Sequence, residues 1–130
     1  MSHRHADWQQ RAFKALADPT RRHVLMLLRT REECLAGEIA DSFPDMSRPA
    51  VSRHLRVLRE AGLVTADGVG REQRYRLSLL GLARVHHEWF AKFDDLWGAA
   101  LAALKERAES RAPRSRERRA PTADQEKRRA

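Results

Sequence analysis

The chain has 130 residues, 42% of them hydrophobic, which is enough for one compact domain with a modest core. It contains no apolar run of about 18 residues that could span a membrane, and its first residues lack the apolar stretch of a secretion signal. Its single cysteine, Cys34, excludes an internal disulfide framework. These features predict a cytoplasmic protein that does not associate with a membrane.

Positive charge is concentrated in two parts of the chain. Residues 111–130 hold eight of the 26 Lys and Arg but three of the 18 Asp and Glu, so they carry +5 of the total charge of +8. Residues 47–76 hold seven arginines and three acidic residues, a net charge of +4. A basic segment inside a folded domain is what binding to a phosphate backbone requires. Nucleic acid is therefore the expected partner of this central segment.

Two helices are predicted near the N-terminus. The first covers residues 7–17. Asp18 and Pro19 are typical of a helix start, so a second helix should follow and continue to about residue 30 with a strongly apolar core face. Arg21 and Arg22 lie in its first turn, where they could contact a phosphate or form surface salt bridges.

A third and a fourth helix are predicted on either side of a tight connection. The segment 35–43 is a short apolar-periodic stretch, and Pro44 prevents it from continuing as a helix. The fourth helix, 47–61, begins at Ser47, a good N-cap residue, and is followed by Gly62, which suits a left-handed cap. Two helices joined by a short turn make a helix-turn-helix.

The fourth helix has an apolar face and a basic face. Val51, Leu55 and Leu58 recur at helical spacing and must pack against the rest of the domain. The remaining surface carries Arg48, Ser52, Arg53, Arg56 and Arg59. Arginines on a solvated helix often serve solubility alone, but the preceding helix and turn favour a recognition helix, whose outer face suits the DNA major groove.

A β-hairpin is predicted after the recognition helix. Its strands are residues 63–65 and 73–77, joined by a glycine-containing turn. Tyr75 and Leu77 should point to one side of the second strand, and Arg74 and Arg76 to the other. The hairpin would complete a winged helix-turn-helix, a mainly α fold with a small β-hairpin wing, about five helices and two strands.

Residues 79–110 have the periodicity of one long helix. Its apolar stripe carries two of the three tryptophans and is too long to be covered within so small a core. Gly98, set among alanines, suggests close approach of two helices or a local bend. We expect a homodimer interface formed by Trp89, Phe93, Leu96, Trp97, Ala100 and Leu104.

The DNA-binding and dimerisation domain is expected to cover residues 1–110. Residues 111–130 have no apolar periodicity, two prolines and alternating charge, which is typical of a disordered segment. Such a basic tail is either a sequence-independent DNA arm or a solubilising end.

Three other classes of function compete with a DNA-binding regulator. An enzyme is not expected, because the chain has no Gly-rich phosphate loop and no plausible nucleophile and base, and no cofactor is implied. A sensor that binds a small molecule or responds to oxidation of Cys34 stays open, as does a winged helix that binds proteins only. The basic outer face of the recognition helix favours double-stranded DNA.

Four stretches of the chain together resemble the ArsR/SmtB family of dimeric winged-helix repressors. They are ALADPTRRHVLMLL, LAGEIAD, SRPAVSRHLRVLREAGLV and GREQRYRLS, in this order within residues 8–105. The resemblance implies a homodimer joined through the last helix and through the first, where Trp8 lies. It also implies recognition helices in successive major grooves of a pseudo-palindromic operator, wings on the flanking backbone, and repression that a signal relieves.

Many members of that family sense metals, but this sequence lacks the ligands of both family sites. The Cys-x-Cys box would fall at Leu35 and Gly37, and Cys34 is displaced from it by one residue. With His86 in register with the second site, the other ligand positions are occupied by Arg84, Trp97 and Ala100. We therefore expect no metal site.

The expected contacts to DNA divide into base reading and phosphate binding. The residues placed to meet base edges are Arg48, Pro49, Ser52 and Arg53. The residues expected on phosphates, which fix the register but carry no sequence information, are Ser47, Arg59, Arg71 and Arg74. Arg56 could reach either base or backbone. His54 is expected to be a partly buried, hydrogen-bonding residue near the phosphates.

Overall fold

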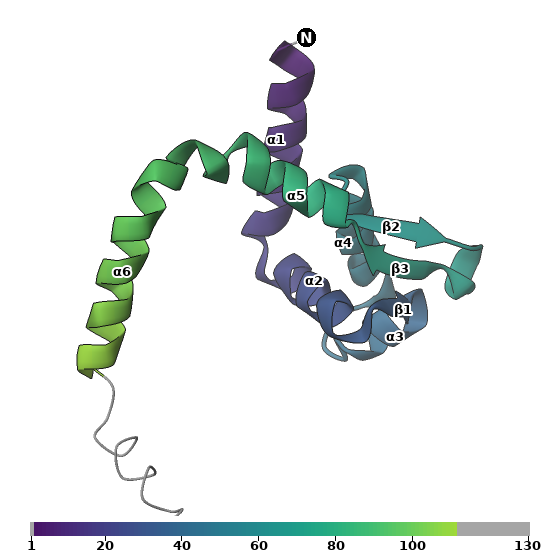
Figure 1. Ribbon diagram of the computed structural model, residues 1–130. Coiled ribbons are helices and arrows are strands. Elements are labelled where there is room, and N and C mark those ends of the chain that lie inside the picture. Colours follow the sequence, from purple (N-terminus) through teal and green to yellow (C-terminus); the bar gives the residue numbers. More distant parts are fainter. Residues whose placement is uncertain (1, 112–130) are drawn as a thin grey trace, which may run out of the picture. The chain divides into compact units, whose positions relative to one another are not determined.

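The computed structural model describes residues 2–111, with side chains for residues 7–70 and 72–111 (Figure 1). The chain divides into two compact units, residues 1–91 and residues 92–130. Within the described range, no helix is long and apolar enough to cross a membrane. The predicted basic tail lies outside the described residues except for Arg111, and its disorder stays a prediction.

Unit 1 contains a winged helix-turn-helix. Its elements in chain order are α1 (Ser2–Ala17), α2 (Pro19–Arg31), β1 (Glu33–Leu35), α3 (Ala36–Asp41), α4 (Arg48–Glu60), β2 (Val64–Asp67), the 3-10 turn η1 (Gly70–Glu72), β3 (Arg74–Leu77) and α5 (Leu79–Glu88). The strands form an antiparallel sheet in the order β1-β3-β2. The predicted fold class is confirmed. The two helices of the helix-turn-helix lie where they were expected but are shorter, with α3 at Ala36–Asp41 and α4 at Arg48–Glu60.

One hydrophobic core holds the helices and the sheet of unit 1 together. Its fully buried side chains include Leu28 of α2, Ile39 of α3 and Leu58 of α4. Burying a leucine of this kind stabilises the fold by about 1.5–3 kcal/mol. Each helix of the helix-turn-helix is therefore fixed by its apolar face, which leaves the opposite face of α4 free.

The sheet has a third strand that the sequence pattern does not predict. β1 is three residues long, and it pairs with β3 so that Cys34 lies opposite Tyr75. On the other edge of β3, Ala66 of β2 pairs with the same Tyr75. A strand this short shows no periodicity of its own, and only its pairing with the wing identifies it. The helix expected from residue 35 accordingly begins at Ala36.

The prediction of a single helix over residues 79–110 is wrong. α5 ends at Glu88, and a 3-10 turn η2 (Phe90–Phe93) precedes α6 (Asp94–Arg111). Trp89 leaves the helical conformation with φ −123° and ψ −64°. Its ring packs edge-on against Phe13 of α1 at 6.0 Å between centroids. The packing of Trp89 onto α1 therefore takes the place of a continued helix. The break lies at Trp89 and not at Gly98, which is inside α6.

Candidate nucleic-acid interface

The predicted recognition helix is α4, and both of its ends are fixed by local hydrogen bonds. Ser47 is its N-cap, and its Oγ accepts the N–H of Ala50 at 3.2 Å. At the other end Gly62 has φ +74°, and the N–H of Leu63 donates to the carbonyl of Leu58 at 3.0 Å. The sequence thus determines where the helix begins and ends, and therefore which residues it presents.

The outer face of α4 carries the residues that the sequence predicts. Val51, Leu55 and Leu58 are buried. Arg48, Pro49, Ser52, Arg53, Arg56 and Arg59 are all exposed. At about 100° per residue, Arg53 lies opposite the buried stripe, whereas Ser52 lies on one flank of the helix and His54 on the other. Arg53 is thus at the centre of the face that would enter a groove.

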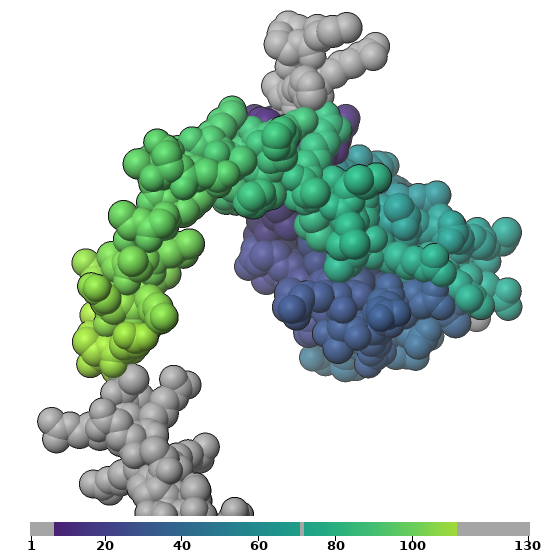
Figure 2. Space-filling model, viewed as in Figure 1, coloured from purple at the N-terminus to yellow at the C-terminus, as the bar shows by residue number. Residues whose placement is uncertain are grey.

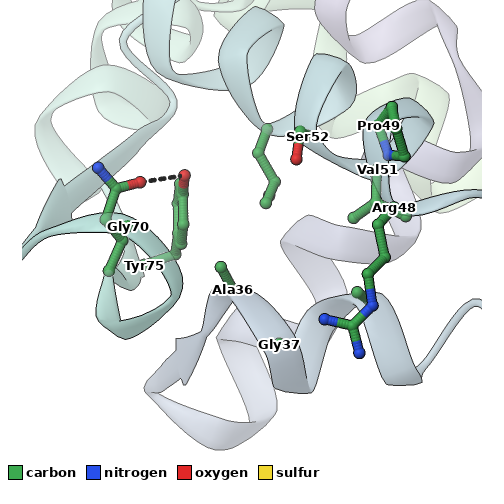
Figure 3. A pocket seen from close by; sticks show the side chains of 11 residues that line it. Ala36, Gly37, Arg48, Pro49, Val51, Ser52, Gly70 and Tyr75 are labelled. Atoms are coloured by element: carbon green, nitrogen blue, oxygen red, sulfur yellow. Dashed lines mark hydrogen bonds between the residues drawn. The ribbon is translucent and has the colours of Figure 1, made fainter.

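A hollow of about 470 Å³ borders the Ser52 flank of α4. Figure 3 shows α4 on one side of it, the start of α3 below and the wing residue Tyr75 across from Ser52. The Tyr75 hydroxyl donates to Oε1 of Gln73 at 2.9 Å. Arg48 and Pro49 also line this hollow, which places three of the four predicted base-reading residues around one depression.

The wing is the β2–β3 hairpin, which projects from the edge of unit 1 (Figures 1 and 2). As predicted, Tyr75 is buried while Arg74 and Arg76 are exposed on the opposite face. The side chain of Arg71 lies outside the described residues, so its place on a phosphate stays a prediction.

An acidic residue that the sequence reasoning missed offsets part of the positive charge on the outer face of the wing. Glu33 of β1 accepts from Nε and Nη2 of Arg76 at 2.9 and 2.6 Å, and lies 3.6 Å from Nη1 of Arg74. The hydrogen bond from Arg76 and the charges of both guanidiniums hold the pKa of Glu33 below its ordinary value. Glu33 therefore offsets part of the charge of Arg74, which is less available to bind a phosphate than the sequence suggests.

Arg21 and Arg22 have a third role that the sequence reasoning did not consider. Arg21 donates from Nε to the carbonyl of Ala15 and from Nη2 to that of Lys14, each at 2.8 Å. Arg22 donates to the carbonyl of Leu16 at 2.8 Å. These are among the last carbonyls of α1, which its own helix cannot satisfy. The two arginines therefore bind the end of α1, and they form no salt bridge within the described residues.

Comparison with known proteins finds the same kind of domain. A family described as a helix-turn-helix domain matches residues 16–66. The solved structure of an ArsR-like transcriptional regulator from Rhodococcus sp. RHA1 is 34% identical, covering 86% of this chain and 100% of that chain with a TM-score of 0.61. The chain belongs to the ArsR family of transcriptional regulators.

Two further relatives have the same domain. The transcriptional repressor SdpR of Bacillus subtilis is 39% identical to this ArsR-family chain over 66 residues, which is 51% of the chain and 71% of the relative. A homodimeric winged helix-turn-helix DNA-binding domain from Mycobacterium bovis is 31% identical with a TM-score of 0.53, and the match covers 70% of this chain and 82% of that one.

The residues of this ArsR-family chain do not fit a metal at either family position. Cys34 is buried, and burial raises the pKa of its thiol, which disfavours the thiolate that binds metals. Leu35 and Gly37 offer no ligand. No group of three His, Cys, Asp or Glu side chains that could hold an ion occurs in the described part of the chain.

The residues predicted to form the dimer interface differ in how much of their surface is exposed in a single chain. Trp8 is buried within unit 1, where the Arg84 guanidinium lies 4.0 Å from the centre of its ring, so it can add little area to a contact between chains. Leu96 and Leu104 of α6 keep 60% and 64% of their surface exposed. The other residues of the set are also exposed, namely Trp89, Phe93, Trp97 and Ala100.

Proposed function

We propose that this ArsR-family regulator is a homodimeric repressor that binds a pseudo-palindromic operator in the cytoplasm and has no catalytic role. Each protomer places α4 in a major groove and its wing on the neighbouring backbone. Bound over a promoter, such a dimer blocks transcription. The observation that carries this proposal is the arginine-rich, exposed face of α4, held at both ends by caps and from behind by the core.

The dimer rests on the composition of α6. Residues 96–104 contain no charged side chain, and none of the α6 residues is buried in the described chain. A helical span that is apolar on all sides is stable in water only when another surface covers it. A second copy of the chain is the proposed cover, and the homodimeric relative supports this choice.

The test is to select duplexes from a random DNA library with the full chain and to sediment the complex. We expect two similar half-sites about one helical turn apart, bound by two chains. Selection of no sequence above background, or a complex containing one chain, would contradict the proposal.

A small molecule is the candidate inducer that would release the repressor from DNA, because a specific hollow favours it. The 470 Å³ hollow is within the size range of ligand sites, and Arg48, Pro49 and Ser52 line it. A ligand there would occupy space that the base-reading face needs. Oxidation is a weaker candidate, because Cys34 is 1% exposed. Cys34→Ser should therefore bind the operator with the same affinity as the wild type, both in reducing and in oxidising buffer.

A further inference from the structure

The Arg21 side chain connects the end of α1 to the recognition helix. Its Nε and Nη2 hold the carbonyls of Ala15 and Lys14, and its Nη1 lies 3.2 Å from Nδ1 of His54 on α4. An arginine has five N–H donors and no acceptor, so three donors are engaged and the remaining hydrogens stay available. Held at three points, the guanidinium is fixed before any DNA arrives.

This contact sets the hydrogen-bonding roles of the two ring nitrogens of His54. Because arginine can only donate, Nδ1 of His54 must be the acceptor, and the imidazole carries its single proton on Nε2. Nε2 makes no hydrogen bond within the described residues. It is not a buried atom, because the buried side-chain atoms without a partner do not include it. His54 therefore presents an accessible N–H donor.

A second hollow, of about 300 Å³, lies on this flank of α4 and is lined by Arg21, Ala50, Arg53, His54 and Val57. Ala50 and Val57 give it small, apolar walls, and the other three residues supply N–H donors. An acid, Asp18, lies nearby: its Oδ2 is 3.8 Å from Nδ1 of His54 and already accepts the N–H of Arg21 at 3.0 Å. Its charge is offset by Arg21, and the hollow keeps an excess of donors.

We infer that this second hollow is a seat for one phosphate of the operator backbone, with Nε2–H of His54 and the free N–H groups of Arg21 as donors. The inference rests on the proposed DNA-binding function. A helix that fills the major groove has a phosphate backbone on either side, and the hollow lies on the flank away from the wing. Arg53 borders the seat but lies at the centre of the outer face, so it remains free to reach the bases.

Two substitutions of His54 separate this role from a structural one. In His54→Asn the amide oxygen stands near the position of Nδ1, so it can still accept from Arg21 but offers no donor at the Nε2 position. In His54→Gln the amide nitrogen stands near the position of Nε2, so the donor to the phosphate is kept. The probe is a duplex selected by the wild-type chain, with single methylphosphonates placed in turn along each strand to remove one phosphate charge.

We expect one methylphosphonate in each half-site to lower wild-type affinity about tenfold, as for a lost hydrogen bond to a charged group. His54→Asn should lower affinity for the unmodified duplex by a similar factor. It should also be less sensitive to that methylphosphonate than the wild type, because only the Arg21 donors remain at the phosphate. His54→Gln should retain most of the affinity and the sensitivity. The salt dependence of all three proteins should be the same, because a neutral donor releases no counterion.

The opposite pattern, in which Asn preserves affinity and Gln loses it, would overturn the seat and leave His54 as a support for Arg21. An Asn variant that is as sensitive as the wild type to the methylphosphonate at every position would also overturn it. Should the Asn variant not fold, the ¹⁵N resonance of wild-type Nε2 decides, since it must shift on adding DNA. A wild-type chain that binds no duplex would overturn the proposed function and the seat together, whereas normal binding without His54-dependent phosphates overturns the seat alone.

Discussion

Gly81 in the first turn of α5 lies directly against the backbone of Gly62 at the end of α4. A Cβ at Gly81 would overlap the carbonyl oxygen of Gly62. Beside this contact, the N–H of Ser78 donates to the carbonyl of Leu63 at 2.9 Å, and Ser78 Oγ accepts the N–H of Gly81 at 3.1 Å. The end of the recognition helix and the start of α5 are therefore joined backbone to backbone.

Gly81→Ala should lower the free energy of unfolding by about 1–3 kcal/mol, the usual cost of overpacking. The clash is with backbone atoms, so no side-chain rotation can relieve it. Gly37→Ala in α3 is the matched control, since a Cβ there meets nothing within 4 Å and should stabilise the helix by about 0.5–1 kcal/mol. Urea denaturation of the three proteins measures both. Equal stability of Gly81→Ala and the wild type would show that the contact is looser than described.

The features predictable from the sequence are those that neighbouring residues determine. Asp18 and Ser47 cap helices through hydrogen bonds three residues away, and the apolar period of α4 identifies its buried face. The recognition helix and the wing follow from such local patterns.

The features that were missed depend on residues distant in the sequence. Glu33 and Arg76 are 43 positions apart, and Arg21 and His54 are 33 apart. No local pattern reports such pairs, so the partly offset charge of the wing face and the Arg21 contacts appear only in the structure. The break after Glu88 has the same origin, because Phe13 lies far from Trp89 along the chain. In the run ADPTRR, which belongs to the family resemblance, Arg21 and Arg22 bind carbonyls at the end of α1.

Glu33→Gln should reduce stability at neutral pH and have less effect in acid. The pKa of Glu33 is lowered by Arg76 and Arg74 from its ordinary 4.5. Stability from a lowered pKa is present above the unfolded-state value and is lost as the pH falls through the folded-state value. The difference in unfolding free energy between the two proteins should therefore shrink below pH 4.5. Because the pair is exposed, the difference at pH 7 should be small.

The same substitution tests whether the wing arginines reach DNA. Removing the charge of Glu33 raises the net positive charge of the wing face that carries Arg74 and Arg76, so non-specific DNA affinity should rise and its salt dependence should steepen. Fluorescence anisotropy with a random duplex over a salt series provides the measurement. Unchanged salt dependence would place this face of the wing away from the backbone.

Leu96→Glu should convert the proposed dimer to monomers, because it introduces a charge into the apolar span of α6 where Leu96 is 60% exposed in one chain. Lys105→Glu introduces the same side chain on α6 beyond that span and should leave the dimer intact. Sedimentation equilibrium at micromolar concentration distinguishes the two. A monomeric wild type, or a dimeric Leu96→Glu variant, would contradict the assignment of α6 to the interface.

Arg53 and Arg71 should affect DNA binding in different ways. Arg53 lies opposite the buried stripe of α4, where it can bind a guanine in bidentate fashion, a contact worth about 1–3 kcal/mol of discrimination. Arg53→Ala should therefore reduce operator affinity and leave binding to random DNA nearly intact. Arg71→Ala should weaken both, and lower the salt slope by about one unit, as expected for a phosphate contact.

Arg53→Lys is the control that separates geometry from charge. Lysine keeps the positive charge but lacks the planar fork that a bidentate contact to guanine uses. It should lose most of the preference for the operator while its salt dependence stays at the wild-type value. Competition between operator and random duplexes at three salt concentrations measures preference and slope together. Should Arg53→Lys keep the full preference, or Arg53→Ala weaken both duplexes by one factor with a reduced slope, Arg53 binds a phosphate and the bases are read from elsewhere on α4.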